Sequence, residues 1–269
     1  MGRVIAVFFA FCILPAFAQA PTLVDNAVLN AASFARNQAV APGSLVSIFG
    51  DNLATQLASA STVPFSTSLG GVSVTFGGIP APLRDVVPGS AGARAQINAQ
   101  LPWNLLGGPV QGSTQIIVTV NGVSSAAQTV PLAELAPGIY SIPPGVGNAI
   151  AVLPDGTIAA PVGSIPGFQT RPAKAGEAIF FYANGLGPVD SRIADGADST
   201  DRLRNTLTVP TVVIDGIAVT PLFSGLAPQY PGVNQVNFVV PNGVRPGNVS
   251  LQIQIGNVTS PPQVTIAVQ

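Results

Sequence analysis

The sequence predicts an all-β protein made of two tandem domains, and three observations lead to this prediction. Four sequence blocks recur in the same order, roughly 135 residues apart, a distance that indicates a duplicated domain rather than a short solenoid repeat. Short segments alternate between apolar and polar residues, which is typical of half-buried strands. The 29 glycines and 26 prolines lie mostly between these segments, so long helices are not expected.

The repeated blocks define the two domains and the segment that joins them. The pairs are residues 41–54 with 174–187, 71–82 with 210–220, 96–102 with 235–241, and 118–125 with 253–260. We expect a first domain over residues 26–132, led by a strand at residues 30–34, and a second domain over residues 173–269. Between them, residues 133–172 form a connector whose β-hairpin turns at Asp155 and Gly156, and we expect it to pack on the second domain.

Individual segments show the strand pattern clearly. Leu251, Ile253 and Ile255 alternate with Gln252 and Gln254, so that the apolar side chains share one face. Asn-Gly and Asp-Gly pairs at residues 121–122 and 215–216 are typical of tight hairpin turns. Regularly spaced short strands predict a β-sandwich or a barrel, and the lack of helical periods between strands excludes a doubly wound α/β fold.

The first 18 residues have the features of a secretory signal peptide. Arg3 precedes an apolar run at residues 4–14 that is too short to span a bilayer, and small residues follow. We expect cleavage after Ala18, with cleavage after Ala20 and an uncleaved membrane anchor as the alternatives. Cleavage would remove Cys12, the only cysteine. The mature protein is then expected to be secreted, periplasmic or on the cell surface, with no membrane span.

The composition excludes several classes of chemistry. The chain has no histidine, its net charge is −1 and only 8% of its residues are charged, so it lacks a basic surface for nucleic acid. Without histidine or a mature cysteine it has no Ser-His-Asp or Cys-His arrangement and no histidine-based metal site. The only glutamates, Glu134 and Glu177, fall in a proline-flanked connector and in a strand block. We therefore expect no enzyme activity, no cofactor and no metal.

Longer motifs resemble a known family. The chain is similar to a bacterial uncharacterised C-terminal domain family first catalogued in Solibacter, and the resemblance covers nearly all of the mature chain. It implies immunoglobulin-like sandwiches of the IPT/TIG kind, and it carries over no catalytic residue. The matching segments are LNAASF at 29–34, VAPGSLVSIFGDNLA at 40–54, SLGGVSVTFGGIPAPL at 68–83, QINAQLPW at 96–103, ANGLGPV at 183–189 and SGLAPQYPGVNQVNFVVP at 224–241.

The candidate binding residues are repeated amides and a few aromatic residues. Gln96 and Asn98 recur as Gln235 and Asn237, on the polar face of equivalent predicted strands. These amides could bind sugar hydroxyls, although such amides more often satisfy neighbouring loop backbone. Trp103, the only tryptophan, is the preferred surface residue, and we hypothesise that it forms a binding patch with the four amides.

Three tyrosines could extend that platform for a sugar or a protein. They are Tyr140, Tyr182 and Tyr230. Because Tyr182 follows Phe180 and Phe181 in a predicted strand, part of this cluster is expected to be core.

The densest charge lies at residues 190–204. Its four aspartates could bind calcium through their oxygens, but their spacing does not match an EF-hand. Nearby arginines offset the charge, so a solvated loop is the preferred interpretation and a calcium site the alternative. The aspartates are Asp190, Asp195, Asp198 and Asp201, and the arginines are Arg192, Arg202 and Arg204.

Together these observations predict a secreted or cell-surface interaction or structural module without catalytic activity. Its partner is expected to be a protein or an extracellular polysaccharide. The alternative is a secreted carbohydrate-binding or carbohydrate-active protein, which a groove with surface aromatic residues beside two carboxylates would favour.

Overall fold

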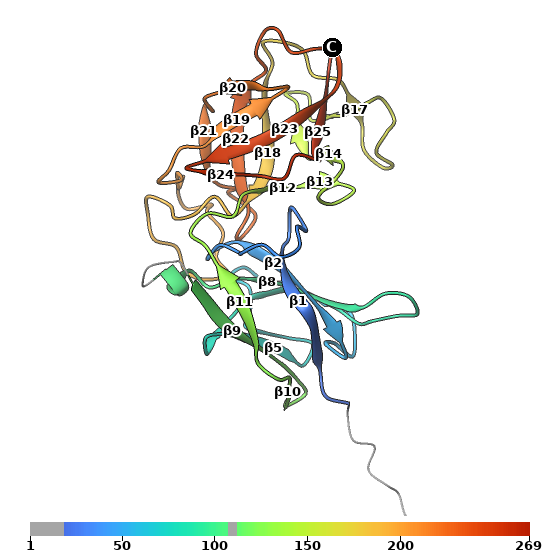
Figure 1. The fold of residues 1–269 in the computed structure, drawn as a ribbon, viewed down its shortest axis with the longest axis vertical. Helices are drawn as coiled ribbons and strands as arrows, with labels where there is room; N and C mark the ends of the chain where they lie inside the picture. Colours follow the sequence, from blue (N-terminus) through green and yellow to red (C-terminus); the bar gives the residue numbers. More distant parts are fainter. Residues whose placement is uncertain (1–18, 107–111) are drawn as a thin grey trace, which may run out of the picture.

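The computed structural model describes residues 19–106 and 112–269 and confirms the predicted all-β fold. Two β-sandwiches are stacked end to end: lobe 1, built from residues 22–132, and lobe 2, built from residues 138–268 (Figure 1). The one helix in these ranges is the short 3-10 helix η1 (Trp103–Leu106). The proposed signal peptide, residues 1–18, lies outside the described residues.

Lobe 1 contains two sheets. The first, which we call the lobe 1 amide sheet, has the strand order β1-β2-β8-β7-β3; its strands are β1 (Thr22–Asn30), β2 (Leu45–Asp51), β8 (Ala95–Gln100), β7 (Leu83–Val87) and β3 (Ala58–Ser59). The second has the order β10-β9-β5-β4, with β11 beside β9 and β6 beside β5; its strands are β10 (Val123–Ser124), β9 (Gly112–Val120), β5 (Val72–Phe76), β4 (Ser68–Leu69), β11 (Gln128–Leu132) and β6 (Ile79–Pro80).

Lobe 2 repeats this arrangement with additional strands. Its amide sheet has the order β17-β16-β15-β18-β22-β21, with β12 beside β18; the strands are β17 (Thr170–Arg171), β16 (Ile158–Ala159), β15 (Ala151–Val152), β18 (Ala178–Asn184), β22 (Asn234–Val239), β21 (Phe223–Leu226) and β12 (Gly138–Ile139). The other sheet has the order β13-β14-β25-β23-β19-β20, with β24 beside β23; its strands are β13 (Ser141–Ile142), β14 (Asn148–Ala149), β25 (Thr265–Val268), β23 (Gly247–Ile255), β19 (Thr211–Ile214), β20 (Ile217–Val219) and β24 (Val258–Thr259).

The sequence repeat corresponds to a repeat of strand register. In lobe 1, Phe49 of β2 pairs with Gln96 of β8. In lobe 2, Tyr182 of β18 pairs with Gln235 of β22. The two members of each repeated block therefore occupy the same place in the two sandwiches, and lobe 2 can be compared with lobe 1 position by position.

The connector contributes strands to lobe 2. β12 and β15 both pair with β18, and β14 pairs with β25. β15 and β16 form an antiparallel hairpin around Asp155 and Gly156, where glycine adopts a φ of 82°. At the other end of the chain, the expected leading strand at residues 30–34 is wrong: β1 ends at Asn30, and the next residues form a turn in which Phe34 has a φ of 51°.

Each lobe has its own hydrophobic core. The main cluster of buried apolar residues in lobe 1 lies between residues 28 and 130, and that of lobe 2 lies between residues 139 and 268; lobe 2 also has a small cluster of Ile158, Ala160 and Ile165. In both cores the inward side chains of two facing sheets interdigitate, as in other sandwiches. No residue belongs to both main clusters, so each lobe has a core of its own.

We predict that residues 19–132 fold without lobe 2, since the whole core cluster of lobe 1 lies within this segment. The isolated fragment should give a single cooperative unfolding transition in urea, followed by circular dichroism. A fragment that is unfolded under conditions in which the full chain is folded would show that the two cores depend on each other.

Buried side-chain amides join the two lobes. Asn184, at the end of β18, is fully buried and contacts Leu45 at the start of β2. Its Nδ2 donates to the Leu45 carbonyl at 2.7 Å, and its Oδ1 accepts from the Leu45 N–H at 3.1 Å. Asn184 Nδ2 also donates to Asn30 Oδ1 at 3.1 Å. One side chain thus satisfies both backbone groups of Leu45 as a neighbouring strand would.

A second buried amide makes a similar link. Gln100 Nε2 donates to the carbonyl of Gly43 at 3.0 Å within lobe 1, and Gln100 Oε1 accepts from the N–H of Gly196 in lobe 2 at 2.6 Å. Gln100 is also fully buried. Since burying an unpaired amide is costly, these links hold the lobes in one relative orientation and define the shape of the cleft between them.

Candidate functional site

The outer face of the lobe 2 amide sheet is unusually aromatic. Because side chains alternate along a strand, Ile179 and Phe181 of β18 fill the core, whereas Phe180 and Tyr182 point outward and are half-buried. Their rings meet edge to face, with centroids 5.6 Å apart. Part of the group formed by Tyr182 and its strand neighbours was expected to be core. Among Phe180, Phe181 and Tyr182, only Phe181 lies in the core.

Two amides lie on the same face. Gln235 and Asn237 of β22 are the register partners of Tyr182 and Phe180, and Asn237 also pairs with Phe223 on β21. Asn237 is therefore flanked by an aromatic residue on each neighbouring strand. We call Phe180, Tyr182, Phe223, Gln235 and Asn237 the aromatic face.

The amides of this face keep free hydrogen-bonding capacity. Gln235 Nε2 donates to Asn237 Oδ1 at 2.9 Å. Within the described part of the chain, no group accepts a hydrogen bond from Asn237 Nδ2. A half-exposed amide between aromatic rings offers donors beside flat apolar surface.

The equivalent face of lobe 1 is different. Gln96 Nε2 again donates to Asn98 Oδ1, at 2.8 Å, but Ser47 and Asp85 occupy the positions of Phe180 and Phe223. Ser47 Oγ donates to Asn98 Oδ1 at 2.9 Å, and Asn98 Nδ2 donates to Asp85 Oδ2 at 3.3 Å. The lobe 1 amides thus bond to neighbouring side chains, while the same amides in lobe 2 lie among aromatic rings.

The aromatic face continues into a cleft between the lobes. This junction cleft has a volume of about 290 Å³. Tyr230 lies at its rim with 50% of its surface exposed, and its ring meets that of Tyr182 edge to face at 5.5 Å. The cleft is lined by Leu45, Phe65, Arg84, Tyr140, Ile150, Tyr182, Tyr230, Pro231 and Val233.

Tyr140 and Tyr182 of the cleft have raised pKa values and remain protonated at neutral pH. Burial raises the pKa of the Tyr140 hydroxyl well above its usual range, although the Arg84 guanidinium lowers it by a smaller amount. Burial and the neighbouring Tyr230 raise the pKa of Tyr182. The Tyr140 hydroxyl oxygen is enclosed and has no hydrogen-bond partner among the described residues. An enclosed hydroxyl without a partner is uncommon in native proteins, and here it lies beside the cleft.

Trp103 belongs to the lobe junction. Its ring covers Gly43, where an added Cβ would overlap the ring, and Gly43 has a φ of 82°. The backbone N–H of Trp103 donates to Asp195 Oδ1 at 2.7 Å, and its indole nitrogen is enclosed without a partner among the described residues. The 3-10 turn directly after β8 carries Trp103 toward residues 188–193 of lobe 2, which line a hollow with it. The structure therefore does not group Trp103 with Gln96 and Asn98.

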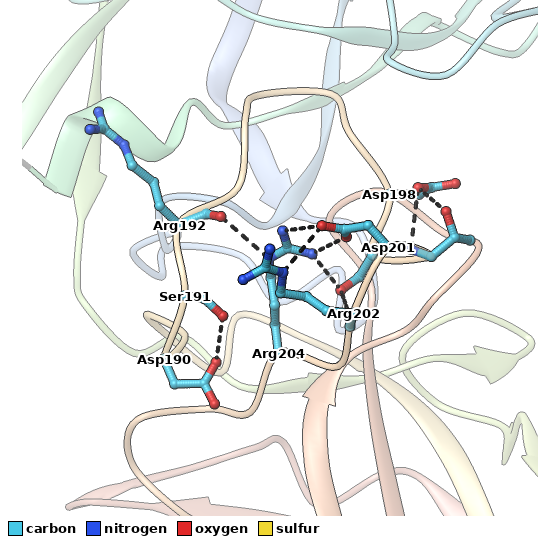
Figure 2. Close-up of polar contacts among 9 residues, drawn as sticks. Asp190, Ser191, Arg192, Asp198, Asp201, Arg202 and Arg204 are labelled. Carbon is cyan, nitrogen blue, oxygen red and sulfur yellow. Dashed lines mark hydrogen bonds and ion pairs between the residues drawn. The ribbon is translucent and has the colours of Figure 1, made fainter.

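The four aspartates of residues 190–204 each have a separate partner, and Figure 2 shows the surroundings of Asp190, Asp198 and Asp201. Asp201 receives two hydrogen bonds from Arg204, at 2.6 and 3.1 Å, and this guanidinium lowers the pKa of Asp201 to about 2. Asp190 accepts from Ser191 and Asn205, and Asp198 accepts from Thr200. With Asp195 bound to the Trp103 backbone, the four carboxylates do not converge. Within residues 19–106 and 112–269, no group of three acidic or sulfur- or imidazole-bearing residues could hold a metal ion.

We predict that calcium leaves the stability of the protein unchanged. A calcium site needs six or more converging oxygens, whereas these carboxylates already accept hydrogen bonds from different groups. The measurement is the thermal unfolding midpoint with and without millimolar calcium, with magnesium as the control. A midpoint that rises with calcium but not with magnesium would contradict the prediction, since a ligand that binds the folded state raises its stability.

Two residues of the site were not found by sequence reasoning. Phe223 lies two residues after Pro221 and outside the repeated blocks, so no repeat signal marked it. Arg84 is one of a few dispersed arginines in the sequence, and only the strand register shows where it points. Comparing each lobe 1 residue with its lobe 2 counterpart would have drawn attention to the change from Ser47 to Phe180.

Comparison with known proteins gives a distant likeness. No protein-family model and no curated protein matches the chain. Among solved structures, SGBP-B from the mixed-linkage glucan utilization locus of Bacteroides ovatus, in complex with a mixed-linkage heptasaccharide, is 11% identical. Its TM-score is 0.31, and the match covers 86% of this chain and 42% of that one. SGBP-B from a complex xyloglucan utilization locus in Bacteroides uniformis is 14% identical, with a TM-score of 0.26 and coverages of 93% and 50%. This chain thus spans half or less of the length of these proteins.

No helix in the described part of the chain is long and apolar enough to cross a membrane.

Proposed function

We propose that this protein is a secreted or cell-surface module that binds a polysaccharide through the aromatic face of lobe 2. The observation that carries the proposal is the difference between the two repeats. Asn98 is held by Ser47 and Asp85, whereas its counterpart Asn237 lies between Phe180 and Phe223 and keeps its Nδ2 donor free of described partners. Of the two copies, only that of lobe 2 combines partly exposed aromatic rings with available amides.

This combination suits a sugar chain. Sugar rings have apolar C–H faces that can stack on aromatic rings, and hydroxyl groups at their edges that can accept or donate hydrogen bonds. Phe180 and Tyr182 are two residues apart on one strand and point to the same face, and their ring centroids are 5.6 Å apart. An extended chain could therefore contact both rings and reach the amides of the neighbouring strand. Tyr230 and the junction cleft would bind the next sugar units of the polysaccharide.

We further propose that binding occurs without hydrolysis. Glycosidases need two carboxylates on either side of the scissile bond, and none of the residues that line the junction cleft is acidic. Glu177 is engaged by Arg171, whose Nη1 and Nη2 donate to its two oxygens at 3.0 and 2.9 Å. This pairing lowers the pKa of Glu177 and makes it a poor proton donor near neutral pH.

The test is affinity electrophoresis of the full mature chain in gels containing different plant and bacterial polysaccharides. We expect at least one polysaccharide to retard the protein relative to a non-binding protein in the same gel. The retained polysaccharide is then incubated with the protein, and no new reducing ends should appear. Migration that is unchanged in every gel would contradict the proposal, and capture of a protein on the same face would favour protein docking instead.

A further inference from the structure

Arg84 occupies a special position in the lobe 1 amide sheet. Leu83 of β7 pairs with Ala99 of β8, and Asp85 pairs with the adjacent Asn98, so Arg84 is the extra residue of a β-bulge. Bulges re-aim side chains and are common beside functional sites. In lobe 2, β21 begins at Phe223, the counterpart of Asp85, so the position equivalent to Arg84 lies outside that strand.

The bulge places Arg84 in the junction cleft, where it is the only charged residue among those that line the cavity. Its side chain is 53% exposed, and its Nε makes a 3.4 Å ion pair with Asp85 Oδ2. Asp85 also accepts a hydrogen bond from Asn98. Across the described residues, the two Nη groups of Arg84 donate to no other side chain. The guanidinium thus lines the cleft, where its charge acts on the Tyr140 hydroxyl, and its Nη groups are available to a ligand.

We propose that the junction cleft selects sugars that carry a carboxylate, with Arg84 as the residue that binds this group. This inference rests on the proposed function, because it concerns the sugar that enters the cleft at the end of the aromatic face. A guanidinium binds a carboxylate through two parallel hydrogen bonds, which matches the free Nη groups. The lining of aromatic and aliphatic residues lowers the local dielectric constant and strengthens such a pair, and it supplies the apolar surface for the sugar ring.

The experiment compares acidic polysaccharides with their carboxyl-reduced forms. Polygalacturonate, alginate and hyaluronan, each native and carboxyl-reduced, are titrated into the full mature chain and into three variants. Arg84→Gln removes the charge, and Arg84→Lys keeps it without the fork. Arg94→Gln is the matched control: Arg94 is 56% exposed, pairs with Asp51, and lies at the opposite end of the same sheet.

We expect at least one native polymer to bind about tenfold or more tightly than its reduced form, as a hydrogen-bonded charge pair requires. Arg84→Gln should abolish this preference, Arg84→Lys should retain part of it, and Arg94→Gln should leave it unchanged. The preference should also weaken as salt is added.

Equal binding of the native and reduced forms, or a preference that survives Arg84→Gln, would overturn the inference. Binding of neutral polysaccharides alone would overturn it too while leaving the proposed function intact. If no polysaccharide of either kind binds, both fail. Circular dichroism of each variant ensures that a lost preference reflects the changed side chain and not an unfolded protein.

Discussion

Replacing Asn184 by alanine is expected to lower the free energy of unfolding by about 2–4 kcal/mol. The substitution leaves the buried N–H of Leu45 without its partner and removes one donor each from the Leu45 carbonyl and from Asn30 Oδ1, although the carbonyl still accepts from the Ala31 N–H. Each unsatisfied buried group costs about 1–3 kcal/mol. In a chain of this size the thermal midpoint should fall by roughly 10 °C.

The measurement is urea unfolding of the full mature chain, monitored by circular dichroism. Asn248→Ala is the control, because Asn248 is an exposed strand residue of the same lobe, and it should change stability by no more than about 0.5 kcal/mol. If both variants unfold at the wild-type midpoint, the amide of Asn184 does not hold the lobes together as described.

Replacing Tyr182 by alanine is expected to weaken polysaccharide binding by about 30-fold or more. Tyr182 lies at the centre of the proposed site, in contact with both Phe180 and Tyr230. Truncating a central aromatic residue of a binding site typically costs 2 kcal/mol or more, which corresponds to a factor of about 30 in Kd. Isothermal titration with the polysaccharide retained in the gels gives this factor directly.

The repeat supplies a matched control for this variant. Phe49 is the lobe 1 counterpart of Tyr182 and also contacts another ring, that of Phe34. Phe49→Ala should therefore remove a similar amount of packing without affecting binding. Phe180→Ser, which introduces the residue that lobe 1 has at position 47, should weaken binding as well. Equal losses from Phe49→Ala and Tyr182→Ala would indicate that both reduce binding only through stability.

Much of the fold could be predicted because its signals are local. The alternation in β8 and β22 correctly places Gln96, Asn98, Gln235 and Asn237 on the outer faces of their sheets. Strand register follows from such alternation, since a slip of one residue would bury the polar side chains. The same alternation of side chains along β18 explains why Phe181 lies in the core and Phe180 points outward.

The site itself depends on contacts that are distant in the sequence. The junction cleft exists because Asn184 and Gln100 join the two lobes, and nothing in the local pattern shows that these amides are buried. The β-bulge at Arg84 depends on how β7 pairs with β8. Trp103 was expected at the surface because a proline precedes it, yet the turn there leads into the junction, where Gly43 leaves room for its ring.

The side-chain amide signals of the full mature chain in nuclear magnetic resonance test the central claim most directly. The retained polysaccharide, cut into short oligosaccharides, is titrated into the labelled protein, and the signals of the four repeated amides are followed. The proposed function predicts that the signals of Gln235 and Asn237 shift with increasing ligand while those of Gln96 and Asn98 stay in place. Shifts confined to Gln96 and Asn98, or no shift at any of the four while the ligand binds, would contradict it.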